Sequence, residues 1–125
     1  MSRGIIRLTS CCAAAVICAM TALAPRVALA HAVLVSAQPE ENSIVTGPDV
    51  PVLLKYNSRI DMEHSTLTLL APDGKLAKVN IGSQPSPGLL SAMLTGLVKG
   101  TYELRWQVLA IDGHVTRGKV LFQIK

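Results

Sequence analysis

The run "TYELRWQVLA" at residues 101–110 is the feature that most constrains the fold of this chain. Its residues alternate in character, with apolar side chains at Tyr102, Leu104, Trp106, Val108 and Ala110 and mostly polar ones between them. A period of two predicts a β-strand with one buried face and one hydrated face. The closing run "KVLFQIK" repeats the pattern, whereas no segment after residue 30 shows a helical period. The chain is therefore predicted to be all-β.

Short β-rich runs separated by turn signals fill the rest of the chain after residue 30. With the two runs above, they predict seven strands, at 32–37, 50–56, 65–71, 76–81, 89–94, 101–110 and 119–125. "APDGK" at 71–75 indicates a tight turn, because Asp-Gly accepts positive φ. "GSQPSPG" at 82–88 indicates a loop, because proline donates no ladder hydrogen bond. Seven short strands favour a small immunoglobulin-like or Greek-key sandwich.

The first thirty residues are typical of a secretion signal. Arg3 and Arg7 precede an uncharged apolar run at 11–24, and "ALA" at 28–30 matches the small-x-small cleavage pattern. The run is shorter than the ~20 residues that span a bilayer as a helix, so a retained anchor is not expected. We predict cleavage after Ala30, which divides the chain into a signal at 1–30 and one exported domain at 31–125.

Cleavage would change the composition in ways that exclude several functions. Removing 30 of the 125 residues leaves 95, with nine Lys and Arg against eight Asp and Glu, a net charge of +1. No clustered basic footprint for nucleic acid is evident in the sequence. All three cysteines, Cys11, Cys12 and Cys18, precede residue 31. The domain would therefore fold without a disulfide, and any metal ligands would be nitrogen, oxygen or thioether rather than thiolate.

His31 would become the first residue after cleavage at Ala30. A terminal histidine offers an α-amine and an imidazole, and the amine and Nδ1 can chelate one metal. Such nitrogen donors suit Cu(II), which favours nitrogen and oxygen ligands in a tetragonal field. The alternative is that a cleavage site happens to precede a histidine.

The stretch "IDGHVTRG" at 111–118 is the second candidate feature. Asp112 and His114 flank Gly113, so a turn there would allow a carboxylate and an imidazole to converge on one ion. The alternative is a plain hairpin turn with a local Asp112 hydrogen bond and a solvated His114. Together His31, Asp112 and His114 supply three nitrogens and one oxygen. This set matches Cu(II) better than structural zinc, which often recruits cysteine.

The residues also resemble those of the CopC family of periplasmic copper-binding proteins. The resemblance rests on "HAVLVSAQPEENSIV", "PVLLKY", "GTYELRWQVLAIDGH" and "GKVLFQI", which cover most of residues 31–125. It implies a seven-stranded Greek-key β-fold, a periplasmic location and one Cu(II) ion bound by the amine and ring of His31, by Asp112 and by His114. It further implies a non-catalytic copper buffer or carrier, partnered by a membrane copper transporter of the CopD type. We expect a monomer.

Several features limit or compete with this interpretation. Some family members have a methionine-rich Cu(I) site, but only Met62 and Met93 lie beyond residue 30, far apart in sequence. His64, in "DMEHS", is expected to be a solvated loop residue, with a weak contact to copper as the alternative. No nucleophile and base pair indicates an enzyme. The competing functions are a small copper oxidase that uses a histidine brace and a structural sandwich that binds no metal.

Overall fold

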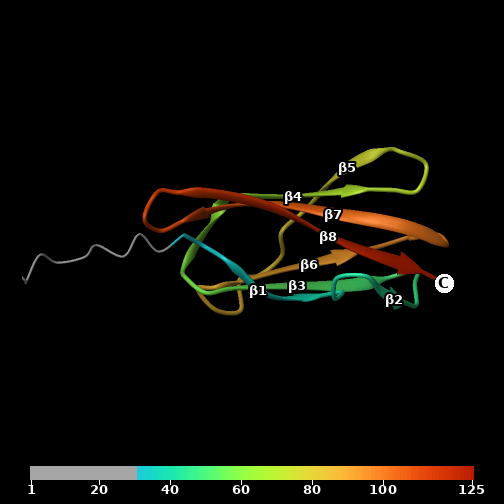
Figure 1. The fold of residues 1–125 in the computed structure, drawn as a ribbon, viewed down its shortest axis with the longest axis horizontal. Helices are drawn as coiled ribbons and strands as arrows, with labels where there is room; N and C mark the ends of the chain where they lie inside the picture. The colour runs from blue at the N-terminus through green and yellow to red at the C-terminus, as the bar shows by residue number, and fades with distance from the viewer. Residues whose placement is uncertain (1–30) are drawn as a thin grey trace, which may run out of the picture.

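The computed structural model describes residues 31–125, which form two β-sheets packed face to face (Figure 1). The smaller sheet has the order β1-β3-β6, with β1 at Leu34–Gln38, β3 at Val50–Tyr56 and β6 at Leu89–Leu94. The larger sheet has the order β2-β8-β7-β4-β5, with β2 at Ser43–Val45, β8 at Val115–Ile124, β7 at Gly100–Ala110, β4 at Ile60–Leu70 and β5 at Leu76–Val79. These residues contain no helix, which confirms the all-β prediction. Accordingly, the described part of the chain offers no helix able to cross a membrane.

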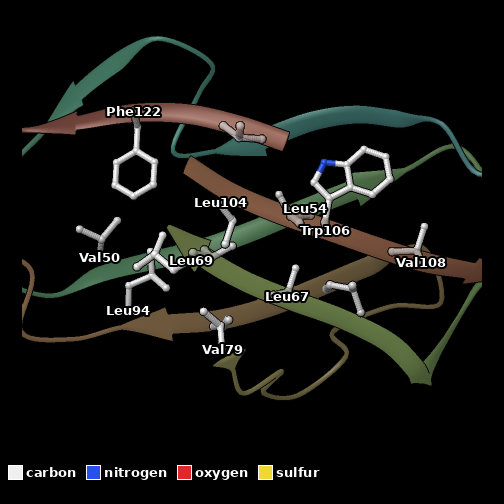
Figure 2. Close-up of a cluster of buried hydrophobic side chains, with 14 of the residues drawn as sticks. Val50, Leu54, Leu67, Leu69, Val79, Leu94, Leu104, Trp106, Val108 and Phe122 are labelled. Carbon is white, nitrogen blue, oxygen red and sulfur yellow. The ribbon is translucent and has the colours of Figure 1, made fainter. Parts of the chain in front are cut away.

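The alternating side chains of β7 and β8 form the centre of the core, as predicted. Figure 2 shows Leu104, Trp106 and Phe122 in the buried cluster, together with labelled residues of β4 in the same sheet and of β3 in the opposite sheet. The rings of Tyr102 and Phe122 stack with centroids 5.6 Å apart, and Trp106 meets Tyr56 edge to face at 5.3 Å. Such aromatic pairs add to the stabilisation that comes from apolar burial.

The structure has eight strands where the sequence predicted seven. The additional strand, β2, pairs in parallel with the end of β8 and has only three residues, too few for an alternation to be recognised. β8 begins at Val115, four residues earlier than predicted, and Gly118 lies within it. A Cβ at Gly118 would come within 2.2 Å of the Trp106 ring, so glycine here admits the indole against the backbone. β5 ends at Val79, and Ile81 makes only an isolated bridge.

β1 spans Leu34–Gln38 rather than the predicted 32–37. A β-bulge in β4 explains a further misplaced boundary. β4 begins at Ile60 rather than at Ser65, and its pairing with β7 shifts between Asp61 and Thr66. The buried Ser65 bridges the irregular segment, since its hydroxyl donates to the Asp61 carbonyl at 2.5 Å and accepts from the Leu109 amide at 3.2 Å. The bulge interrupts the period of two, so the alternation is visible only after it.

The sandwich brings the first described residues to the same end as the β7–β8 turn (Figure 1). β1 pairs antiparallel with β3, with a register shift between Leu34 and Ser36, and its start lies close to the start of β8. This arrangement positions His31 near a turn some eighty residues later in the sequence.

Candidate metal centre

The turn between β7 and β8 is built around a glycine that adopts a left-handed conformation. The Ala110 amide donates to the His114 carbonyl at 2.8 Å, and the Gly113 amide donates to the Ala110 carbonyl at 2.9 Å. Gly113 has a φ of 90°, which favours glycine because it lacks a Cβ. The result is a three-residue loop of the kind that commonly joins antiparallel strands. It presents Asp112 and His114 side by side.

The carboxylate of Asp112 is held against His114. Asp112 Oδ1 accepts the backbone amide of His114 at 3.0 Å, and Oδ2 lies 3.2 Å from His114 Nδ1. The amide hydrogen bond is the main reason why the pKa of Asp112 is lowered, and the rings of His114 and His31 contribute further. His114 Nδ1 is buried and makes no well-aligned hydrogen bond in the described chain. The turn therefore places an ionised oxygen donor beside an imidazole nitrogen.

Two side chains from other elements fix the chain that follows His31. Asn57 Oδ1 accepts a hydrogen bond from the Val33 backbone amide at 2.8 Å, and the backbone amide of Asn57 donates to the Val33 carbonyl at 3.0 Å. Thr116, at the start of β8, donates its hydroxyl to the Ala32 carbonyl at 2.9 Å. Ala32 itself is buried in the core. These contacts, which we call the N-terminal clamp, leave His31 exposed directly above the β7–β8 turn.

The clamp brings the two candidate imidazoles together. The rings of His31 and His114 lie with centroids 4.8 Å apart at an interplanar angle of 84°. His31, Asp112 and His114, which are far apart in sequence, are thus neighbours. Within residues 31–125, however, no three His, Asp or Glu side chains are already close enough to hold a metal ion. The donors are adjacent in pairs, and the exposed His31 side chain would have to turn to complete a site.

The remaining candidate ligands lie outside this group. His64 pairs with Asp61 inside the β4 bulge, with Nδ1 2.8 Å from Asp61 Oδ2, so it belongs to a strand rather than to the predicted loop. That contact is the main reason why the pKa of Asp61 is lowered. Met62 packs partly against the core, whereas Met93 is exposed on β6.

Sequence reasoning missed Asn57 and Thr116. Neither residue type suggests metal chemistry, and both act through backbone groups of Ala32 and Val33, which precede β1 and are distant in sequence. Their only signals are positional: Asn57 directly follows β3, and Thr116 lies two residues after His114. Predicting the clamp would have required the pairing of β1 with β3 and its proximity to β8.

Comparison with solved structures defines the class of fold. CopC from Methylosinus trichosporium OB3b matches with a TM-score of 0.70 and 28% identity, covering 76% of this chain and 94% of that one. PcoC, a methionine-rich copper resistance protein from Escherichia coli, matches with a TM-score of 0.64 and 22% identity, covering 77% and 100%. The chain thus has the β-sandwich fold of these proteins.

Sequence comparison gives the family. The CopC domain model matches residues 34–125, which include Asp112 and His114 but begin three residues after His31. Protein YobA of Escherichia coli strain K12 is 27% identical over 99 residues, which span 77% of this chain and 80% of YobA. This chain belongs to the CopC family, as its resemblance to that family suggested.

Proposed function

We propose that this protein binds one Cu(II) ion in the periplasm and buffers it or carries it to a partner. The observation that supports this most strongly is the approach of His31 to His114 beside the Asp112 carboxylate, with ring centroids 4.8 Å apart. Imidazole nitrogens and a carboxylate oxygen are donors that Cu(II) accepts well, and the group contains no thiolate. Membership of the CopC family supports copper as the cargo.

The proposed ligands are the α-amine and ring of His31, the carboxylate of Asp112 and the ring of His114. The amine becomes available only if the signal is removed after Ala30, so processing would create part of the site. Because the N-terminal clamp holds Ala32 and Val33, the new terminus would stay above the β7–β8 turn. A membrane copper transporter of the CopD type is the partner that we propose.

The paired histidines also fit a second function, a copper oxidase with a histidine brace. Asp112 argues against it, because a hard anionic oxygen beside His114 favours Cu(II) over Cu(I) and would oppose the reduction that oxidase chemistry needs. Incubating the copper-loaded protein with ascorbate and a polysaccharide distinguishes the two functions. Oxidised sugars above the free-copper control would overturn the proposal that the protein is only a carrier.

Copper titration of the exported protein tests the site directly. Trp106 is the only tryptophan of the chain, so its fluorescence reports Cu(II) binding without a label. We expect one equivalent of Cu(II) to quench the emission of the wild type, and the double variant His31→Ala/His114→Ala to lose this tight binding. His64→Ala is the matched control, because it removes an exposed histidine that pairs elsewhere. Equal affinity in the double variant and the control would refute the site.

A second experiment tests the terminal amine. A variant processed to leave one glycine before His31 keeps every side chain but moves the amine away. We expect its Cu(II) affinity to fall sharply, and mass spectrometry of the exported wild type should show His31 as the first residue. Unchanged affinity in the extended variant would show that the amine is not a ligand.

A further inference from the structure

The outer face of the five-stranded sheet gathers basic side chains from three strands. The pairing register places Lys119 of β8 opposite Arg105 of β7, Arg105 opposite Thr68 of β4, and Thr68 opposite Lys78 of β5. Because strands lie about 4.8 Å apart, this row spans roughly 15 Å. Arg117 of β8 starts the adjacent row. We call the surface formed by Lys78, Arg105, Arg117 and Lys119 the basic face.

These side chains point outward because they alternate with core residues. On β7, Arg105 lies between the buried Leu104 and Trp106, and on β8 Lys119 precedes the buried Val120. Arg105, Arg117, Lys119 and Lys78 are all exposed. The position of the basic residues therefore follows from the same alternation that builds the sandwich.

The charge of the basic face is only partly compensated by its neighbours. Glu103 is the one carboxylate among the residues that line its central hollow, and it pairs with Arg105 Nε at 2.9 Å. The hydrogen bond from Arg105 is the main reason why the pKa of Glu103 is lowered, and the charge of Lys119 contributes. Glu40 and Glu41 lie on the other side of Lys119, where Glu41 accepts the Leu121 amide. Three cations, Arg105, Arg117 and Lys119, therefore share the hollow with one carboxylate. Lys78 lies at the β5 edge in a hollow that Glu63 also lines, and Glu40 and Glu41 lie at the β8 edge.

Hydrogen bonds orient the two guanidinium groups. Arg105 uses Nε for Glu103, and Arg117 uses Nε for Gln107 Oε1 at 2.6 Å. The described contacts involve neither pair of terminal nitrogens, so each group keeps a forked donor that matches a carboxylate. Between these groups lies an open hollow of about 470 Å³, which Thr66 and Thr68 also line. The hollow is large enough to admit acidic side chains.

We propose that the basic face binds an acidic segment of a partner protein, whose Asp or Glu side chains enter the hollow between β4, β7 and β8. A concave site with forked donors and hydroxyl groups suits side chains better than a flat bilayer surface. The four aromatic residues of the described chain, Tyr56, Tyr102, Trp106 and Phe122, are all buried. Trp106 also lines the hollow but is only 9% exposed, so the basic face presents no exposed aromatic group of the kind that commonly anchors proteins at a membrane interface.

A partner bound there would also lie close to the candidate metal centre. His114 directly precedes β8, and Arg117 lies three residues after it, a distance of roughly 10 Å in extended chain. Docking on the basic face would thus bring a partner within reach of the copper site, although the proposal does not depend on copper binding.

Nuclear magnetic resonance of the exported, ¹⁵N-labelled protein without copper tests the proposal. The probe is a ten-residue peptide of alternating Glu and Ser. We expect its titration to shift amides in 66–68, 103–107 and 117–119, and the binding to weaken as salt rises from 50 to 300 mM. The variant Arg105→Glu/Lys119→Glu should weaken binding at least about tenfold. Lys55→Glu/Lys99→Glu is the matched control, since it makes the same charge change at exposed sites on β3 and in the β6–β7 loop and should change binding less than about twofold.

Three results of the peptide titration would overturn the proposal. They are the absence of localised shifts at millimolar peptide, shifts that map outside the basic face, and equal weakening by both double variants. Vesicles of phosphatidylglycerol serve as the competing probe. If they bind with the same dependence on Arg105 and Lys119 while the peptide does not bind, the occupant is a membrane and the proposal is wrong. The neutral variant Arg105→Gln/Lys119→Gln should weaken peptide binding by an intermediate amount, which guards against misfolding of the charge-reversed protein.

Discussion

The hydroxyl of Thr116, in the strand that follows His114, donates a hydrogen bond to the carbonyl of Ala32, the residue after His31. We predict that Thr116→Val, which keeps the shape and removes the donor, weakens Cu(II) binding by roughly 10- to 100-fold, as loss of a residue that orients metal ligands commonly does. Thr116→Ser should restore it. The measurements are the Cu(II) affinity and the electron paramagnetic resonance spectrum, which reports ligand geometry. A Val variant with the wild-type spectrum and affinity would show that the clamp does not position the site.

Asp112 contributes a charge whose pH dependence differs from that of the other proposed ligands. Its lowered pKa means that it stays ionised to lower pH than a free aspartate and is lost as a ligand only when pH falls through that lowered value. Protons also compete with Cu(II) for the imidazoles and the α-amine, because these groups bind a metal only in their deprotonated forms.

This difference gives a prediction for Asp112→Asn. The variant should bind Cu(II) at least about tenfold more weakly at pH 7, yet the slope of log affinity against pH between 5 and 7 should match the wild type. Isothermal titration calorimetry at four pH values measures both quantities. A flatter slope in the variant would mean that Asp112 takes up a proton in this range and would contradict the direction of its pKa.

At the scale of elements, the bulge in β4 depends on one buried hydroxyl. Ser65→Ala would leave the Leu109 amide and the Asp61 carbonyl without their partner, and an unsatisfied buried polar group costs about 1–3 kcal/mol. We predict a loss of that size in the free energy of unfolding, measured by urea denaturation. Ser43→Ala is the control, because its hydroxyl also bonds a carbonyl but in contact with solvent. An equal loss in both variants would contradict the role given to burial.

Strand prediction from the sequence succeeded where side chains alternate and failed where the pairing is irregular. β3, β6 and β7 were predicted within a residue of their observed bounds, because their period of two is unbroken. The start of β4 was missed because the bulge between Asp61 and Thr66 breaks the period. β2 was missed because its pairing with β8 depends on a contact distant in sequence.

The same distinction applies to the candidate site. Asp112-Gly113-His114 was recognisable because a short turn places its own residues together. The sequence suggested the approach of His31 to His114 but could not establish it, because it depends on β1 and β8 starting at one end of the sandwich. Asn57 and Thr116 could not be predicted, because their role lies in bonds to a backbone far away in sequence.

At the scale of the whole molecule, the core and the candidate metal centre are separate. Twenty buried apolar residues form one cluster between the sheets, and His31 and His114 lie outside it at one end of the sandwich. All three cysteines lie in the first thirty residues, so no disulfide supports the described domain. Its stability must therefore come from the apolar core, whereas in a zinc finger the metal itself drives folding.

This separation predicts how removal of the metal affects the protein. The apo form prepared with a chelator should stay folded below its unfolding transition, with an unchanged circular dichroism spectrum, and should unfold cooperatively on heating. Free Cu(II) at one hundred times the Kd should add about 2.7 kcal/mol to the free energy of unfolding. For a domain of this size that corresponds to a rise of roughly 10–20 °C in Tm.

The double variant His31→Ala/His114→Ala provides the control for this measurement. Both residues lie outside the buried cluster, so we expect the variant to keep the apo Tm within a few degrees and to show no rise with Cu(II). Differential scanning calorimetry with and without copper measures both quantities. If the chelator alone unfolds the wild type, folding depends on the metal, and the conclusion that the core and the metal centre are separate is wrong. If copper raises the Tm of the variant as much as that of the wild type, the ion binds elsewhere on the molecule.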